Sequence, residues 1–267
     1  MIRRLPAVET LGSTTVICRD KTGTLTKGEM TVKQVYIYDH FIEVTGVGYN
    51  VRGGISYSGI NKKDLLLFVR CAVLCNDAKI ELQQDNIIKM SEDPTEVALL
   101  ILAKKVGILD DERDSNLFPR LREIPFTAER KMMITIHRLN IMKDVIFAKG
   151  APEIILNRCN RFLKDSQFLP LTDKIKDYIP SVNHEMAREG LRVLALASGE
   201  VETVTTLVEN ANNNNNFLFL GLAGIIDPSR KEVKDAVDQC KSSGINVVMI
   251  TGDQKLTALA IAKEVEL

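Results

Sequence analysis

The fold is decided by residues 14–26, which read TTVICRDKTGTLT. Residues 14–18 are apolar or β-branched, a pattern typical of a buried strand in a parallel sheet. This strand runs into Asp20, and Gly23 ends it. Because α/β sheets bind their ligands at the carboxyl ends of parallel strands, the carboxylate of Asp20 predicts a ligand site at this point.

The end of the chain carries a matching pattern of alternating strands and helices. Residues 217–226 and 245–250 are predicted strands, and residues 229–243 and 253–265 are predicted helices. A strand–helix–strand–helix order is typical of an open parallel sheet. We therefore expect both ends of the chain to build one parallel, Rossmann-like domain.

The segment between the two ends has a different character. It contains short strand signals with glycine turns at roughly 31–58 and further predicted strands at 134–138, 144–148 and 192–197. Helical patterns follow at 63–75, 94–106 and 174–189, with a short helix starting at Pro152. We expect a large α+β domain, built on an antiparallel sheet and inserted into the parallel one. The predicted boundaries are 1–30 and 221–267 for the parallel domain and 31–220 for the insert.

The composition restricts the class of protein. The 267 residues include 35 basic and 35 acidic ones, and this balance argues against a nucleic-acid binder. No apolar run approaches the roughly 20 residues that span a bilayer, and the first residues do not form a signal peptide. Five scattered cysteines lack the spacing of a zinc site and predict buried or half-buried free thiols in a reducing compartment. Composition alone predicts a soluble intracellular protein.

The residues after the first strand suit phosphoryl chemistry. A carboxylate such as Asp20 can attack a phosphoryl group and form an aspartyl-phosphate. The N–H groups and hydroxyls of residues 22–26 could hold phosphate oxygens, while Lys21 and Mg²⁺ would offset the converging charge. The alternative is a simple turn in which Asp20 caps the loop.

Residues 20–26, DKTGTLT, resemble the phosphorylation signature of the P-type ion-pumping ATPases, within the haloacid dehalogenase-like superfamily. The resemblance implies that Asp20 is the phosphoryl acceptor and that Thr22 helps to bind phosphate and Mg²⁺. Phosphatases of the superfamily have a second aspartate at the position of Thr22. Because threonine cannot transfer a proton at neutral pH, we expect the phosphoenzyme to persist.

Two segments near the end of the chain extend the resemblance. Thr251, Gly252 and Asp253 match the second phosphate motif of the family and open a predicted helix, although such a tripeptide also serves as a helix cap. Residues 227–230, DPSR, are similar to the family's Asp-Pro-Pro-Arg. Asp227 and Arg230 are therefore candidates for the nucleotide site. The alternatives are a helix cap for Asp227 and a surface position for Arg230.

In the insert, the resemblance implies an ATP pocket. Phe126 would stack on adenine with Lys131 as a cationic neighbour, although a lone phenylalanine is more often a core residue. Lys149 and Gly150 open the sequence KGAPE, which resembles the nucleotide-pocket motif of the family.

Two further charged residues belong to this implied pocket. Glu96 would accept a hydrogen bond from the adenine edge, unless it serves only as the capping-box glutamate of the helix that Asp93 opens. Arg192 would lie near the polyphosphate, again with a purely structural role as the alternative.

The resemblance also implies the setting of this chain. The absence of CxxC and His-Pro dipeptides favours the calcium/sodium-potassium-like type II branch over the heavy-metal branch. The family's Gly-Asp-Gly-x-Asn-Asp hinge is absent. We therefore expect the cytoplasmic nucleotide-binding domain and an incomplete phosphorylation domain of an integral membrane pump, soluble as this piece.

In the intact pump, the partners of this piece would be the transmembrane and actuator domains and the transported cation. The piece itself should bind ATP and phosphorylate itself poorly or not at all. The alternatives are a soluble haloacid dehalogenase-like phosphatase and a non-catalytic nucleotide-binding module.

Overall fold

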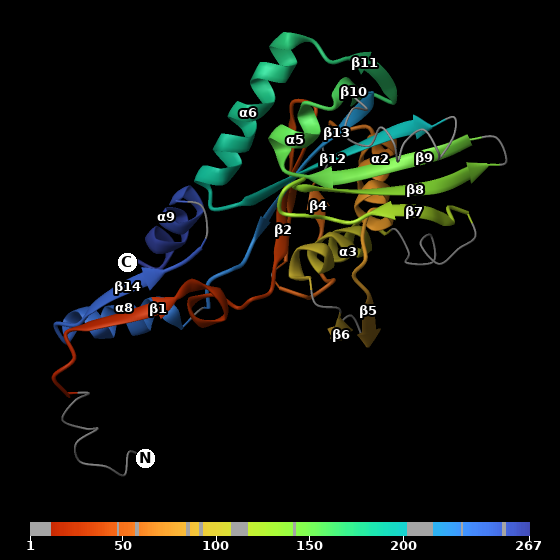
Figure 1. Cartoon of the computed structure of the whole chain (residues 1–267). Coiled ribbons are helices and arrows are strands. Elements are labelled where there is room, and N and C mark those ends of the chain that lie inside the picture. The colour runs from red at the N-terminus through yellow and green to blue at the C-terminus, as the bar shows by residue number, and fades with distance from the viewer. Residues whose placement is uncertain are drawn as a thin grey trace.

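Figure 1 shows a computed structural model of the chain, in which a large sheet with its helices adjoins a smaller unit. The smaller unit holds the beginning and the end of the described chain. The structure describes residues 12–46, 48–56, 59–83, 86–90, 93–107, 117–140, 143–201, 216–230, 232–252 and 255–267.

The smaller unit is a parallel pair of strands from opposite ends of the chain. Strand β1 (Val16–Asp20) runs parallel to β14 (Asn246–Ile250), with Asp20 opposite Ile250. Helices α8 (Val233–Ser242) and α9 (Lys255–Glu264) accompany the pair. The predicted pairing of the two chain ends in a parallel sheet is confirmed. The prediction of a buried first strand is wrong, because four of the five residues of β1 are exposed. The strand predicted at 217–226 does not join this pair: it lies in the larger sheet with antiparallel neighbours, because its apolar side chains need cover on both faces.

Helix α8 begins four residues later than the expected start at residue 229. The main chain there pairs with the residues after Asp20 instead of winding into a helix. Lys27 N donates to Pro228 O and Arg230 N donates to Leu25 O, both at 3.0 Å. Backbone groups engaged in these bonds cannot take part in a helical turn, so the helix starts after them.

The larger unit is built on a ten-stranded sheet. Its main path runs β4-β3-β2-β13-β12-β9-β8-β7, and β10 joins β13 to β11. All neighbours are antiparallel except β10 and β13, which confirms the predicted antiparallel architecture of the insert. The strands are β2 (Thr31–Ile37), β3 (His40–Val44), β4 (Ile55–Ser56), β7 (Arg120–Ile124), β8 (Met132–Asn140), β9 (Lys143–Gly150), β10 (Cys159–Lys164), β11 (Gln167–Pro170), β12 (Arg192–Val201) and β13 (Phe217–Ile226). A separate hairpin pairs β5 (Ile80–Gln83) with β6 (Asn86–Met90).

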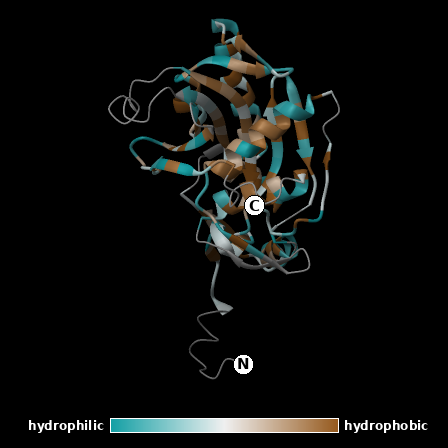
Figure 2. Ribbon diagram, turned by 90° about the vertical axis from the view of Figure 1, so that its right-hand side faces the viewer, coloured by the Kyte–Doolittle hydropathy of each residue, from teal (hydrophilic) through white to brown (hydrophobic). Residues whose placement is uncertain are grey.

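Helices cover both faces of this sheet. One face packs against α2 (Lys62–Leu74) and α3 (Pro94–Val106), and the other against α5 (Pro152–Leu156) and α6 (Asp173–Arg188). The central strands are therefore apolar on both sides, and hydrophobic residues occupy much of the ribbon in Figure 2. Within the described ranges, no helix has the length and hydrophobicity to cross a membrane.

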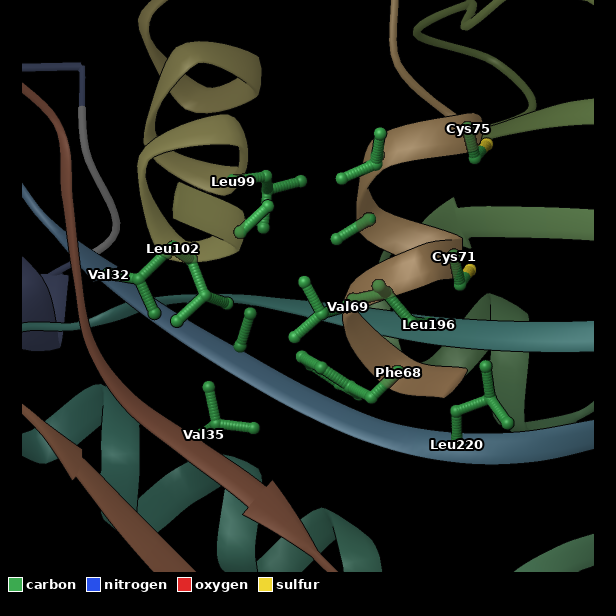
Figure 3. Close-up of a cluster of buried hydrophobic side chains, with 14 of the residues drawn as sticks. Val32, Val35, Phe68, Val69, Cys71, Cys75, Leu99, Leu102, Leu196 and Leu220 are labelled. Carbon is green, nitrogen blue, oxygen red and sulfur yellow. The ribbon is translucent and has the colours of Figure 1, made fainter. Parts of the chain in front are cut away.

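The strand period separates the two cores. In β12, Leu196 belongs to the α2–α3 core, while its neighbours Ala195 and Ala197 belong to the α5–α6 core. Figure 3 shows Leu196 in the first core with Phe68 and other apolar side chains.

Helix α3 has the predicted boundaries. The Asp93 side chain caps it by accepting from Thr95 N at 2.8 Å and Glu96 N at 3.3 Å. Pro94 occupies the first turn, and Gly107 ends the helix with a φ of 84°. These signals act within a few residues and were readable in the sequence.

All five cysteines are free, as predicted. Cys71 and Cys75 lie on the same side of α2, toward the sheet (Figure 3), with the Cys71 sulfur 3.4 Å from Ala197 O. Burial raises the pKa of the Cys75 thiol to about 11 and raises those of Cys71 and Cys159 as well. The predicted burial is wrong for Cys18, which is exposed because it lies on the largely exposed strand β1.

This difference predicts selective thiol chemistry. In the folded chain near pH 8, an alkylating reagent should modify Cys18 and leave Cys71, Cys75 and Cys159 intact until denaturant is added. Raising the pH towards 10 should still leave Cys75 unmodified, because its pKa lies above that value. Peptide mass spectrometry would measure this, and equal labelling of Cys18 and Cys75 would contradict it.

Candidate functional site

Asp20 and the segment after β14 leave the small sheet at the same edge. Asp20 lies opposite Ile250, so Lys21 and Thr251 follow side by side in the register. The Asp20 carboxylate is exposed, and its Oδ1 accepts from Thr22 N at 3.2 Å. Gly23 has a φ of 74°, which lets the loop turn back. The parallel pairing therefore places the predicted acceptor beside the second predicted phosphate motif.

Asp227 joins the loop after Asp20 to the end of β13. Its Oδ2 accepts from Thr26 Oγ1 at 2.6 Å and its Oδ1 from Gly28 N at 2.8 Å. The Lys21 ammonium lies 3.9 Å from Oδ2, and both side chains are buried. Asp227 therefore caps no helix. It satisfies buried groups that are about 200 residues away in the chain.

Arg230 also binds this loop. Its guanidinium donates from Nε to Thr26 O and from Nη2 to Gly23 O, each at 3.0 Å. The sequence predicted either a nucleotide contact or a surface position for Arg230. Its hydrogen bonds to these two carbonyl groups are a third role that was not predicted. Arg230 fixes the shape of the loop that starts at Asp20.

A cleft of about 550 Å³ lies between the two units. It brings together six of the predicted site residues, from four distant parts of the sequence: Lys21, Phe126, Lys131, Arg192, Asp227 and Gly252. The two ends of the chain supply one wall, and α5, α6 and β12 supply the other. Its volume falls in the range of roughly 300–1,000 Å³ that is typical of small-molecule sites.

Phe126 is the exposed aromatic group of this cleft. Its side chain is 58% exposed, so it is not the core residue that a lone phenylalanine usually is. Lys131 follows in a left-handed conformation with a φ of 51°. Gly150 permits this turn, because a Cβ there would lie 2.4 Å from Lys131 O. Phe126 and Lys131 thus enter the cleft from one turn.

Lys149 and Glu96 form a buried ion pair. Lys149 Nζ donates to Glu96 Oε1, and neither residue is more than 9% exposed. Glu96 Oε2 accepts from the backbone N–H groups of Asp77 at 2.8 Å and Ala78 at 2.9 Å. The carboxylate therefore binds these groups instead of completing a capping box at Asp93. Lys149 lies two residues before the cleft-lining residues 151–153.

Comparison with known proteins assigns the family. The family model for "P-type ATPase, cytoplasmic domain N" matches residues 64–232. The chain belongs to the P-type ATPases.

Full-length relatives agree with this assignment. The chain is 39% identical to calcium-transporting ATPase 1 of Lactococcus lactis, aligned over all of this chain and 28% of that protein. It is 40% identical to human calcium-transporting ATPase type 2C member 1, again over all of this chain and 28% of the relative. The cation-transporting ATPase pma1 of Synechocystis is 40% identical over 98% of this chain and 30% of its own length. This P-type ATPase chain thus spans less than a third of these relatives.

The residues of one wall of the cleft were not predicted from the sequence. Helix α6 contributes Pro180, Asn183, His184 and Ala187. The spacing of three, four and seven residues places them on one helix face, so helical periodicity could have identified them as a group. Their types carry no catalytic signature, and for that reason they did not attract attention.

Several predicted site residues of this P-type ATPase chain do not line the cleft. Asp20, Thr22, Thr251 and Arg230 lie at or near the loop edge, and Glu96, Lys149 and Gly150 are buried within the larger unit. Asp253 lies outside the described residues.

The residues at the loop edge fit Mg²⁺ only in part. Asp20 offers an exposed carboxylate, which Mg²⁺ binds together with phosphate oxygens and water. Asp227 offers no comparable ligand, because its oxygens accept from Thr26 and Gly28. Within the described ranges, His, Cys, Asp and Glu side chains do not gather into a metal-binding group of three.

The contacts of Asp227 predict a local effect of its removal. In Asp227→Ala, exchange of the Gly28 amide hydrogen should speed up about 10- to 100-fold, because a hydrogen bond to a charged acceptor contributes about 1.5–3 kcal/mol. Hydrogen exchange followed by NMR would measure it. Asp235→Ala, at an exposed acid on α8, is the matched control. Equal exchange rates in the two variants would show that Asp227 does not hold the loop.

Proposed function

We propose that this chain is the ATP-binding and phosphoryl-accepting part of a cation-transporting P-type ATPase of the calcium/sodium-potassium-like type II branch. The observation that carries the proposal is the cleft. It joins an exposed aromatic side chain, Phe126, to residues beside the acceptor loop, Lys21 and Gly252. A ligand with an aromatic group and a phosphoryl group fits these two ends.

The distribution of charge supports one orientation of ATP. The buried Lys149 is neutralised by Glu96, so it adds no unpaired positive charge beside the cleft-lining residues 151–153, which suits an uncharged base. Lys131 and Arg192 line the cleft with cationic side chains, which suit the polyphosphate. The N–H groups and hydroxyls after β1 and β14 suit the γ-phosphoryl group.

The proposed reaction is transfer of the γ-phosphoryl group to Asp20. A carboxylate oxygen of Asp20 forms a bond to the γ-phosphorus, while the bond from that phosphorus to the bridging oxygen breaks and ADP leaves with the electron pair. Mg²⁺ would supply charge neutralisation at the phosphates, with Asp20 and Thr22 as its proposed protein contacts. Lys21 and the loop N–H groups orient the phosphoryl group.

The proposal includes the domain organisation and the wider assembly. Residues 1–30 and 221–267 would form part of a haloacid dehalogenase-like phosphorylation domain, with the nucleotide-binding domain at 31–220. The transmembrane and actuator domains and a transported cation would complete the pump. Calcium is the first cation to test, since it is named for the Lactococcus lactis and human relatives.

ATP titration of the 267-residue chain tests the proposed pocket. The wild type should bind ATP, and Phe126→Ala should raise the Kd about five- to hundredfold, because base stacking contributes about 1–3 kcal/mol. Phe168→Ala is the matched control, since Phe168 is 50% exposed and does not line the cleft. Isothermal titration calorimetry would compare the three proteins. Equal affinities for wild type and Phe126→Ala would remove Phe126 from the site.

Labelling with γ-³²P-ATP tests the proposed acceptor. We expect slow, partial and acid-stable labelling of this chain, since Asp20 is the one carboxylate that the described loop edge offers to Mg²⁺. Asp20→Asn should abolish the label, while Asp235→Asn should keep it. Label in Asp20→Asn would exclude this acceptor, and rapid stoichiometric labelling would contradict the expected rate. Sustained hydrolysis of a simple phosphomonoester would favour a phosphatase.

A further inference from the structure

Lys149 is held in place by a short loop that lies outside the cleft. The loop consists of residues 75–78 and follows α2 directly. Its Asp77 and Ala78 N–H groups both donate to Glu96 Oε2, and Glu96 Oε1 accepts from Lys149. Burying a carboxylate without such hydrogen-bond partners would cost free energy. The orientation of Glu96 therefore depends on where this loop points its N–H groups.

Asn76 fixes the loop to both helices of the first core. Its side chain is fully buried, and its Nδ2 donates to Ala72 O at 3.1 Å and to Glu96 O at 3.0 Å. Its Oδ1 accepts from Ala78 N at 2.9 Å. The end of α2 and the first turn of α3 are thus tied through one side chain.

Arg120 holds the same loop from the other side. From β7, its Nη2 donates to Leu74 O at 2.9 Å and Asn76 O at 2.7 Å, and its Nη1 donates to Asp77 Oδ1 at 2.5 Å and Glu123 Oε2 at 2.9 Å. The planar guanidinium binds several acceptors in fixed directions, which lysine cannot do. Its charge also lies at the carboxyl end of α2, where the helix dipole favours a cation.

We propose that Arg120 is a positioning residue for the nucleotide site and acts on Lys149 through the 75–78 loop and Glu96. This inference rests on the proposed function. Arg120 does not line the cleft, so it acts only through this series of bonds. Lys149 in turn fixes the end of β9, from which residues 151–153 enter the cleft wall.

Removal of Arg120 should weaken the hydrogen bonds that connect the 75–78 loop, Glu96 and Lys149, beginning at the loop. The carbonyls of Leu74 and Asn76 lose their shared donor, the loop N–H groups rotate, and Glu96 keeps Lys149 in a less defined position. Outer partners that orient metal ligands typically contribute 10- to 100-fold in metal affinity, and by analogy we expect an increase in the ATP Kd of about tenfold.

The experiment compares Arg120→Met, Arg120→Lys and Arg122→Met in the 267-residue chain. Arg122 lies on the same strand with an exposed side chain, so Arg122→Met is the matched control. ATP affinity is measured by calorimetry well below the thermal midpoint of each variant. The ¹⁵Nζ–¹H NMR signal of Lys149, assigned with Lys149→Arg, reports its environment without nucleotide.

We expect a raised Kd and a shifted Lys149 signal in Arg120→Met, smaller changes of both in Arg120→Lys, and neither in Arg122→Met. A lower thermal midpoint with an unchanged Kd and Lys149 signal, in either Arg120 variant, would reduce Arg120 to a structural residue and overturn the proposal. If the wild type binds no ATP, the proposed function fails, while the Lys149 signal of the nucleotide-free chain still tests the positioning.

Discussion

The carboxylate of Asp227 holds together the two places at which the chain passes between its two units. It accepts from the Thr26 hydroxyl and the Gly28 amide, and it lies close to the buried ammonium of Lys21. At 4% exposure, the charge needs these partners, and they need it. The loop after Asp20 and the end of β13 therefore keep one relative position, and the placement of Asp20 beside the cleft depends on it.

The shape of the cleft depends on these contacts of Asp227 and on a second contact nearby. Helices α6 and α9 meet across it (Figure 1), where Gly190 follows the end of α6 with a φ of 82°. A Cβ on Gly190 would lie 2.9 Å from the Cβ of Ala260, so glycine permits this approach. One wall carries the aromatic side chain of Phe126 and the other the loop of Asp20. Packing between the two units therefore sets the distance between the loop of Asp20 and the side chain of Phe126.

Elements and contacts with a signal in neighbouring residues were predicted correctly, and those that depend on distant residues were missed. The boundaries of α3 followed from Asp93, Pro94 and Gly107. The strands β5, β6, β7, β10 and β11 were missed, because short polar segments such as RLREI acquire strand structure from their neighbours in the sheet. Glu96 was predicted to be a site residue, but its partners at Asp77 and Ala78 could not be identified, since loop N–H groups leave no mark in a sequence.

The sequence by itself determined the phosphorylation signature, the family resemblance, the helix caps and the meeting of the two chain ends in a parallel pair. Each of these features depends on the types of a few neighbouring residues, or on strand patterns that allow few pairings. Only the tertiary structure decided that Asp227 and Arg230 bind the loop after Asp20, that Lys149 is paired and buried, and that α6 forms a wall of the cleft. The physical reason is that a buried charge takes its role from the groups that desolvate and pair with it, and the partners of Lys149 and Asp227 lie 53 and 201 residues away in the chain.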